Sequence, residues 1–141
     1  MKGGTLIGML LVAIQFGCKR EEIVIDELKT NPFDTDYAGP ALFTKVDERT
    51  VPYVINGIAH QRLELDVRVN TEPLNGNTGY GVSYRAIGVS SSVTVPATDL
   101  ADGRFTMEIL DVIAGTAYCA EVRITNGGGA GGGNTLCGMA Q

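Results

Sequence analysis

Residues 112–125, VIAGTAYCAEVRIT, decide the fold of this chain of 141 residues. A tight Ala114-Gly115 turn is followed, from Tyr118 onward, by strict alternation of apolar and polar side chains. Successive side chains of a β-strand point to opposite faces of its sheet, so this period of two predicts a strand with one buried face. The buried face would carry Tyr118, Ala120, Val122 and Ile124, and the outer face Cys119, Glu121, Arg123 and Thr125.

Further strands are expected from residue 40 onward, where turn signals are evenly spaced. Asx-Gly pairs accept the positive φ that a turn demands, and they occur at Asn56-Gly57, Asn75-Gly76, Asp102-Gly103 and Asn126-Gly127. The runs between them predict strands at residues 41–46 with 51–55, 58–70, 79–87, 92–95, 105–109 and 134–140. Pro52 and Pro96 indicate that the first and fourth of these are edge strands. Together with residues 118–125, they predict an all-β, seven-stranded sandwich of two antiparallel sheets.

Two motifs resemble the fibronectin type III family of immunoglobulin-like sandwiches. YGVSYR at residues 80–85 is similar to the family's third strand. Residues 109–129, ILDVIAGTAYCAEVRITNGGG, are similar to its fifth strand, corner and sixth strand. The resemblance covers about residues 40–141 and implies that the ring of Tyr118 enters the core while its hydroxyl bonds to backbone just upstream.

The expected corner and core combine this resemblance with the strand alternation. In the resemblance, Val112 takes the place of the corner leucine. The family's core tryptophan is missing, since the chain has none, so Leu65 and Val67 must fill that volume. The main corner and core positions are therefore predicted at Leu65, Val82, Tyr84, Val112, Tyr118 and Val122.

Cys119 and Cys137 are hypothesised to form a disulfide. A hairpin centred on the glycine run pairs residues whose numbers sum to about 256 to 260, which places these two nearly opposite each other. Both would lie on the outer face, within reach of a bridge. Closing a loop of about 19 residues contributes about 3 kcal/mol in the chain-entropy model.

Residues 1–17 are predicted to be a lipoprotein-type signal peptide. Lys2 precedes an apolar run that, at about 12 residues, is too short to span a bilayer but suits a secretory signal. The run ends at Gly17-Cys18, which resembles the bacterial lipoprotein signal, in which the cysteine becomes acylated. Gln15 stands where that signal usually has an aliphatic residue, so a plain secretory signal or a buried helix stays open as an alternative. Acylation of Cys18 would leave the other two cysteines as a pair in an oxidising compartment.

Residues 18–39 are expected to form an acidic tether that lifts the domain, residues 40–141, off a membrane. The acidic residues after Cys18, with NPFD at residues 31–34, resemble the front ends of Bacteroidota surface lipoproteins. That resemblance implies a lipid anchor in the outer membrane and exposure at the cell surface. Asp34 and Asp36 supply too few ligands for a calcium site, so they are interpreted as solvated linker charges.

No catalytic constellation is predicted from the titratable residues. His60 is the only histidine in the sequence, which leaves no material for a Ser-His-Asp triad or a histidine metal site. It is interpreted as a surface residue at a strand end. Cross-strand pairing is expected among Arg62, Glu64, Asp66 and Arg68, and between Arg85 and Glu121. The net charge of −5 without a basic patch disfavours nucleic acid as a partner, and no cofactor or metal is expected.

We therefore expect a non-catalytic module of the cell envelope that recognises a protein or a glycan. Its contacts would come from residues 70–79 and a glycine loop at one end, or from an exposed sheet edge. The glycine loop is expected to be a flexible hairpin tip comprising Asn126, Gly127, Gly128, Gly129, Gly131, Gly132, Gly133 and Asn134. The alternatives are a structural subunit of an envelope complex or surface polymer assembled through a strand edge, and a glycan-active enzyme.

Overall fold

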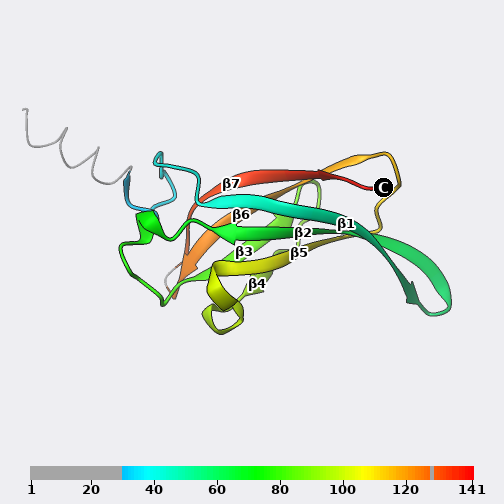
Figure 1. The fold of residues 1–141 in the computed structure, drawn as a ribbon, viewed down its shortest axis with the longest axis horizontal. Helices are drawn as coiled ribbons and strands as arrows, with labels where there is room; N and C mark the ends of the chain where they lie inside the picture. Colours follow the sequence, from blue (N-terminus) through cyan, green and yellow to red (C-terminus); the bar gives the residue numbers. More distant parts are fainter. Residues whose placement is uncertain (1–29, 128) are drawn as a thin grey trace, which may run out of the picture.

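The computed structural model describes residues 30–127 and 129–141. Within this part of the chain, seven strands form two antiparallel sheets around one core (Figure 1). One sheet has the strand order β1-β2-β5 and the other β4-β3-β6-β7. The strands are β1 (Phe43–Ile55), β2 (Ile58–Val69), β3 (Gly81–Ala86), β4 (Val93–Val95), β5 (Arg104–Leu110), β6 (Ala117–Asn126) and β7 (Gly129–Met139). The predicted all-β, seven-stranded antiparallel sandwich is confirmed.

The core lies between the sheets, where the alternation placed it. The side chains of Leu65, Val82 and Val122 are fully buried, and Tyr84 and Val112 are also buried. The ring of Phe105 stacks on that of Tyr84, with centroids 6.5 Å apart, and meets the edge of Phe43 at 6.3 Å. Phenylalanine rings, as well as the predicted aliphatic residues, therefore fill the core of this chain without tryptophan.

The corner between β5 and β6 positions Tyr118 as the resemblance implied. The Ile113 N–H donates to the Tyr118 hydroxyl oxygen over 2.9 Å, and the half-buried ring packs against the core. Asp111, just after β5, has a φ of 57°, a left-handed conformation that carries the chain out of the sheet. The corner thus fixes where β6 begins.

Cys119 and Cys137 form the hypothesised disulfide. They lie directly opposite each other in the β6–β7 register, with Cα atoms 4.0 Å apart. Their neighbours Ala120 and Leu136 are buried in the core. Because successive strand residues alternate between faces, the bridge lies on the outer side of the four-stranded sheet.

The first strand is continuous through Pro52, which is tolerated because β1 is the edge of its sheet. A bulge between Lys45 and Asp47 shifts its register with β2. Beyond β2, β1 meets β7 of the other sheet. The Asn134 side chain accepts a 3.0 Å bond from the Phe43 N–H and donates a 3.1 Å bond to the Phe43 carbonyl. Asn134, predicted to belong to a binding loop, instead bridges the two sheets.

The prediction of a flexible glycine loop is wrong, because Gly129–Met139 form strand β7. Gly131 and Gly132 are buried beneath the chain segment that precedes the sandwich. The Gly132 N–H donates to the Pro32 carbonyl over 2.9 Å. A Cβ atom on Gly131 would lie 2.7 Å from Phe33 Cα, so the close approach depends on glycine.

The expectation of a solvated tether is wrong for the part of that segment which the structure describes. Pro32 is buried, and Phe33 and Tyr37 pack against the core. The Tyr37 hydroxyl donates to the Pro40 carbonyl over 2.8 Å. These residues therefore belong to the folded unit. The predictions for residues 1–29, including the signal peptide and Cys18, and for Gly128 lie outside the described residues.

Strands β1 and β2 continue beyond the rest of the sandwich as a two-stranded arm, residues 52–61 (Figure 1). β2 pairs with β5 only between Arg62 and Arg68, whereas its pairing with β1 continues to Ile58 opposite Ile55. The Asn56-Gly57 turn at the tip has φ values of 51° and 80°, as this dipeptide predicts. The tip carries exposed aliphatic side chains from both strands.

Candidate functional site

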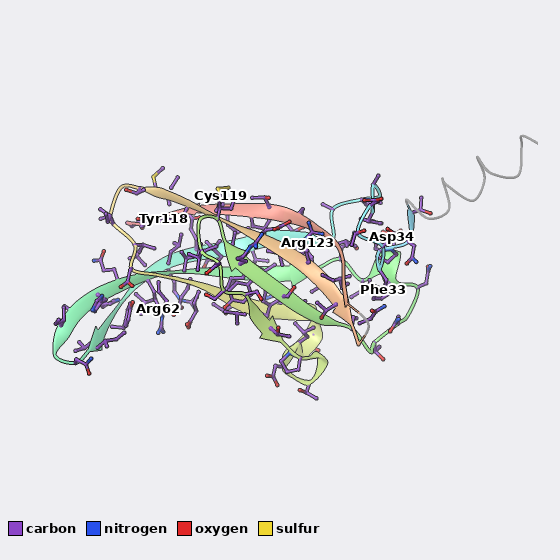
Figure 2. All side chains as sticks on the ribbon, turned by 180° about the vertical axis from the view of Figure 1, so that it is seen from behind. Phe33, Asp34, Arg62, Tyr118, Cys119 and Arg123 are labelled. Carbon is purple, nitrogen blue, oxygen red and sulfur yellow. A yellow bond between two sulfur atoms is a disulfide. The ribbon has the colours of Figure 1, made fainter. Side chains whose placement is uncertain are left out.

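The loops predicted to make contacts lie at the end of the sandwich where residue 30 enters. Asn70 donates its N–H to the Leu42 carbonyl over 2.8 Å, close to the docked segment. Figure 2 shows Phe33 and Asp34 at this end, Cys119 near the middle of the molecule and Tyr118 beyond it. The glycine residues of the predicted loop belong to β7, so the surfaces described next are the two outer sheet faces and the arm.

The outer face of the three-stranded sheet, which we call the charged face, carries a network of ion pairs centred on Glu64 and Asp66. Arg49 Nε donates to Glu64 Oε2 over 2.7 Å, and Arg49 Nη1 donates to Asp66 Oδ2 over 3.0 Å. Arg62 Nε donates to Glu64 Oε1 over 2.8 Å. The strand registers place four arginines and four carboxylates on this face: Arg49, Arg62, Arg68 and Arg104, with Asp47, Glu64, Asp66 and Glu108. The predicted cross-strand pairing is confirmed for Glu64 and Asp66, which bond to Arg49 of β1, and for Arg62, whose Nε lies 3.6 Å from Glu108 Oε1 of β5. Arg68 forms no ion pair with any residue that the structure describes.

Hydrogen bonding and ion pairing on the charged face lower the pKa of Asp66. A 2.8 Å hydrogen bond from the Thr106 hydroxyl, followed by bonding to Arg49, lowers the pKa of Asp66 below its ordinary value of 3.8. Glu64 is only 6% exposed, because the two arginines cover it. Glu64 and Asp66 are therefore already paired, which leaves them little capacity to bind a cationic ligand.

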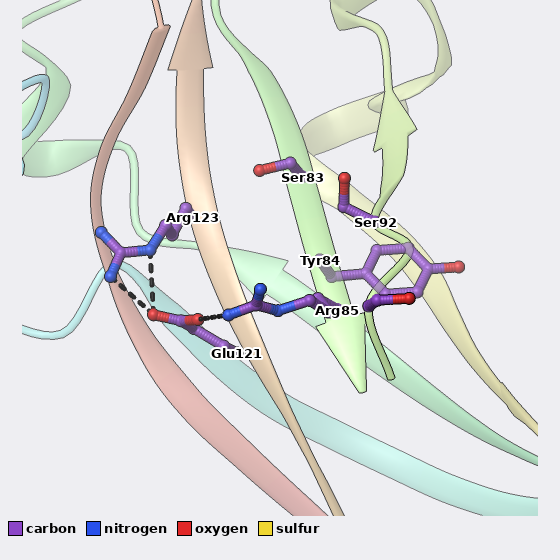
Figure 3. Close-up of a pocket in the computed structure, with 7 residues that line it drawn as sticks. Ser83, Tyr84, Arg85, Ser92, Glu121 and Arg123 are labelled. Carbon is purple, nitrogen blue, oxygen red and sulfur yellow. Dashed lines mark hydrogen bonds and ion pairs between the residues drawn. The ribbon is translucent and has the colours of Figure 1, made fainter. Parts of the chain in front are cut away.

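The outer face of the four-stranded sheet carries a sparser charge row (Figure 3). Arg85 Nη2 donates to Glu121 Oε2 over 3.1 Å, and Arg123 Nε donates to Glu121 Oε1 over 2.9 Å. Arg123 Nη1 also donates to the Gly131 carbonyl over 3.2 Å. The arginines, Arg123 first and then Arg85, lower the pKa of Glu121. The predicted pair of Arg85 and Glu121 is confirmed, but two arginines share one carboxylate.

Two shallow hollows adjoin this row and share Arg85, Ser90 and Glu121 as lining residues. The first, of about 230 Å³, is also lined by Ser83 and Ser92. The second, of about 350 Å³, is also lined by Ile87 and Val89. The serines Ser83 and Ser92 of the first hollow and the aliphatic residues Ile87 and Val89 of the second therefore meet at Arg85.

An apolar patch continues from the second hollow across the sheet. Ile87 is 65% exposed, and its N–H donates to the Cys119 carbonyl over 2.9 Å, which places it beside the disulfide. Met139, opposite Ala117 in the β6–β7 register, is half exposed. We call the surface formed by Arg85, Ile87, Val89, Glu121 and Met139 the recognition face.

The base of the arm holds a second polar cluster. The Tyr53 hydroxyl donates to Asp111 Oδ1 over 2.9 Å, and His60 Nδ1 lies 2.6 Å from the same oxygen. The rings of Tyr53 and His60 stack with centroids 5.3 Å apart. These bonds, Tyr53 first, lower the pKa of Asp111. The cluster ties the arm to the corner, a structural role that the sequence did not suggest for His60.

Comparison with protein-family models, curated proteins and solved structures finds no match for this chain. In residues 30–127 and 129–141, no three His, Cys, Asp or Glu side chains gather as metal ligands. No helix in the same ranges has the length and apolar character needed to cross a membrane.

The residues of the recognition face were not predicted as site residues. The alternation of residues 79–87 already turned Ile87 outward, opposite to the inward Tyr84 and Ala86. Val89 and the serines lie in the connection to β4, and only the fold brings them beside Arg85 and Glu121. Met139 reaches the same surface through the β6–β7 register.

Proposed function

We propose that this protein is a lipid-anchored lipoprotein of the cell envelope whose fibronectin type III-like module recognises another envelope protein or a glycan without catalysis. The observation that carries the proposal is the contrast between the two sheet faces. At the centre of the charged face, Glu64 and Asp66 are paired with arginines, whereas the recognition face exposes Ile87, Val89 and Met139 beside a partly paired Arg85. Exposed apolar side chains bordered by polar groups are typical of protein interaction sites.

The tyrosine corner and the strand order support the family assignment within this proposal. The anchor would be the acylated Cys18, in the outer membrane and with the module at the cell surface. Between Cys18 and Thr30 the chain reaches at most about 40 Å when extended. The apolar part of the recognition face lies beside the first residues of β6, whereas the entering segment packs on Gly131 and Gly132 at the start of β7, so an anchor at Cys18 would leave this face uncovered.

Site-specific cross-linking in intact cells tests the recognition role. A photoreactive residue in place of Ile87 is expected to give a discrete, light-dependent adduct of higher mass. The matched control replaces Thr106, which is exposed on the charged face, and is expected to give none. No adduct at Ile87, or equal adducts at both positions, would contradict the proposal.

The anchor is tested separately by metabolic labelling with a fatty-acid probe. The parent chain is expected to take up the label and the Cys18→Ala variant to lose it. Labelling that persists in the variant would place the lipid elsewhere. No labelling of either chain would contradict the lipoprotein assignment and leave a secreted form.

A second candidate is a structural subunit that assembles through its arm. The aliphatic tip formed by Val54, Ile55 and Ile58 favours it, because Val54 lies on one face of the ribbon and the isoleucines lie on the other. Assembly by simple strand addition along β1 is disfavoured by Pro52, which has no N–H to donate. Light scattering that finds a monomer across all concentrations would exclude this candidate.

A further inference from the structure

Resting on that proposed function, we propose that the recognition face binds an acidic side chain flanked by aliphatic residues on a partner protein. The carboxylate would bind Arg85, and the neighbouring aliphatic side chains would pack against Ile87 and Val89. The juxtaposition that carries this inference is the shared wall of the two hollows, where a guanidinium group meets an exposed aliphatic surface.

The guanidinium of Arg85 has unused donor capacity. Its side chain is 51% exposed, and Nη2 bonds to Glu121. Its Nε and Nη1 donate no hydrogen bond to any residue that the structure describes. A guanidinium presents five N–H donors in a planar fork that matches a carboxylate. Arg85 can therefore donate hydrogen bonds to a second carboxylate without losing its bond to Glu121.

The charge of the face favours an anionic partner. Arg85 and Arg123 share the single carboxylate of Glu121, so this row carries one uncompensated positive charge. The chain as a whole has a net charge of −5, and the charged face is balanced between arginines and carboxylates. An approaching carboxylate would thus find its favourable local field at this row.

The aliphatic surroundings favour a protein over an acidic sugar. Ile87 and Val89 form an exposed apolar wall beside Arg85, which suits valine- or leucine-like side chains. Sugar rings commonly stack on exposed aromatic rings. The one aromatic residue that lines these hollows is Tyr84, and its ring is buried against Phe105.

A second copy of this chain is a poor occupant of the face. In a two-fold symmetric contact the same patch lies on both sides of the interface. The uncompensated charge beside Arg85 would then approach its own equivalent, which is unfavourable. The partner inferred here carries the opposite charge.

The test is a titration of the full chain, ¹⁵N-labelled and held in non-ionic detergent micelles, followed by NMR. The probes are the blocked peptide Ala-Val-Glu-Val-Ala, its glutamine and lysine counterparts, and glucuronate as the acidic sugar. The protein variants are Arg85→Gln and the matched control Arg68→Gln, which removes an equal charge from the opposite face.

The glutamate peptide is expected to shift the amides of residues 83–90 and 119–123 saturably at concentrations up to about 10 mM. Binding is expected to weaken about fivefold or more for the glutamine peptide and for Arg85→Gln, because each lacks one half of the charged pair. Arg68→Gln should bind like the parent chain.

Three outcomes would overturn the inference. They are equal binding of the lysine peptide, binding of glucuronate as tight as that of the glutamate peptide, and no saturable shift with any probe. The Ile87 cross-link separates this inference from the proposed function. An adduct in cells without any peptide binding rejects the acidic partner alone, whereas loss of both results rejects recognition by this face.

Discussion

The two outer faces of this sandwich use similar residues to opposite effect. On the charged face, Arg49 and Arg62 converge on Glu64 and cover it, and Thr106 completes the bonding of Asp66. On the recognition face, Arg85 donates a hydrogen bond from Nη2 to Glu121, and its other N–H groups, near Ile87, bond to no residue in the described part of the chain. The difference lies in the carboxylates within reach: Glu64, Asp66 and Glu108 lie within ion-pair distance of Arg49 or Arg62, whereas Arg85 and Arg123 share Glu121.

The first way to break the comparison is to remove the disulfide that holds the recognition face together. Cys119→Ala with Cys137→Ala is expected to lower the free energy of unfolding by about 3 kcal/mol, because the unfolded chain regains the entropy of the opened loop. Urea denaturation measures the loss. Reducing agent should destabilise the parent chain by a similar amount and leave the double variant unchanged, and an insensitive parent would contradict the structural role of the bridge.

The next effect concerns the charged face, where the pairing is structural. Arg49→Met combined with Arg62→Met leaves the buried Glu64 without its partners and is expected to cost about 2 kcal/mol. The comparison variant Arg85→Met on the recognition face should cost about 0.5 kcal/mol or less, because its partner Glu121 keeps Arg123 and is more exposed. Equal losses in denaturant midpoint would remove the distinction between the faces.

Acid titration gives a smaller effect with a definite sign. The pKa of Asp66 is lower in the folded chain than its ordinary value of 3.8, so its ionised form stabilises the fold above that value. This contribution is lost as the pH falls through the lower folded pKa, and solvent screening limits it to less than about 1 kcal/mol. Asp66→Asn should therefore be less stable than the parent chain at neutral pH.

The stability gap between Asp66→Asn and the parent chain is expected to close as the pH falls from 3.8 through the lower folded pKa of Asp66. Thermal unfolding from pH 7 downward measures this gap, with Glu72→Gln, exposed at the end remote from the arm, as the control. A gap that widens in acid would contradict the assigned role of Asp66.

The smallest expected effect on stability comes from the apolar side chain at the centre of the recognition face. Ile87→Ser should change the free energy of unfolding by about 0.5 kcal/mol or less, since Ile87 is largely exposed. The same variant should reduce cross-linking from a photoreactive residue placed at Val89. If Ile87→Ser is as stable as the parent chain but cross-links more weakly, then Ile87 contributes to recognition and not to folding.

The parts of the fold that depend on local pattern were predictable. The alternation after Tyr118 correctly gave β6, and hairpin register alone placed Cys119 opposite Cys137. The bond from the Ile113 N–H to Tyr118 followed from the likeness to a known corner. Each of these features involves residues close in sequence or adjacent strands, where spacing carries the geometry.

The parts that depend on distant contacts were not predictable. A run of glycines favours turns, but Gly131 and Gly132 lie in a strand because a segment about 100 residues earlier packs on them. The length of the arm depends on where β5 stops pairing with β2. The hollows beside Arg85 require the connection to β4 to fold back over β3, which no periodicity reveals.

The most direct measurement of the contrast between the faces is hydroxyl-radical footprinting of purified protein and of intact cell envelopes. Met139 on the recognition face and Leu110 on the charged face are each 53% exposed, so each can be compared with itself in the two preparations. The account predicts that labelling of Met139 and Ile87 falls in the envelopes, while labelling of Leu110 is unchanged. Unchanged labelling of all three residues, or protection of Leu110 alone, would contradict it.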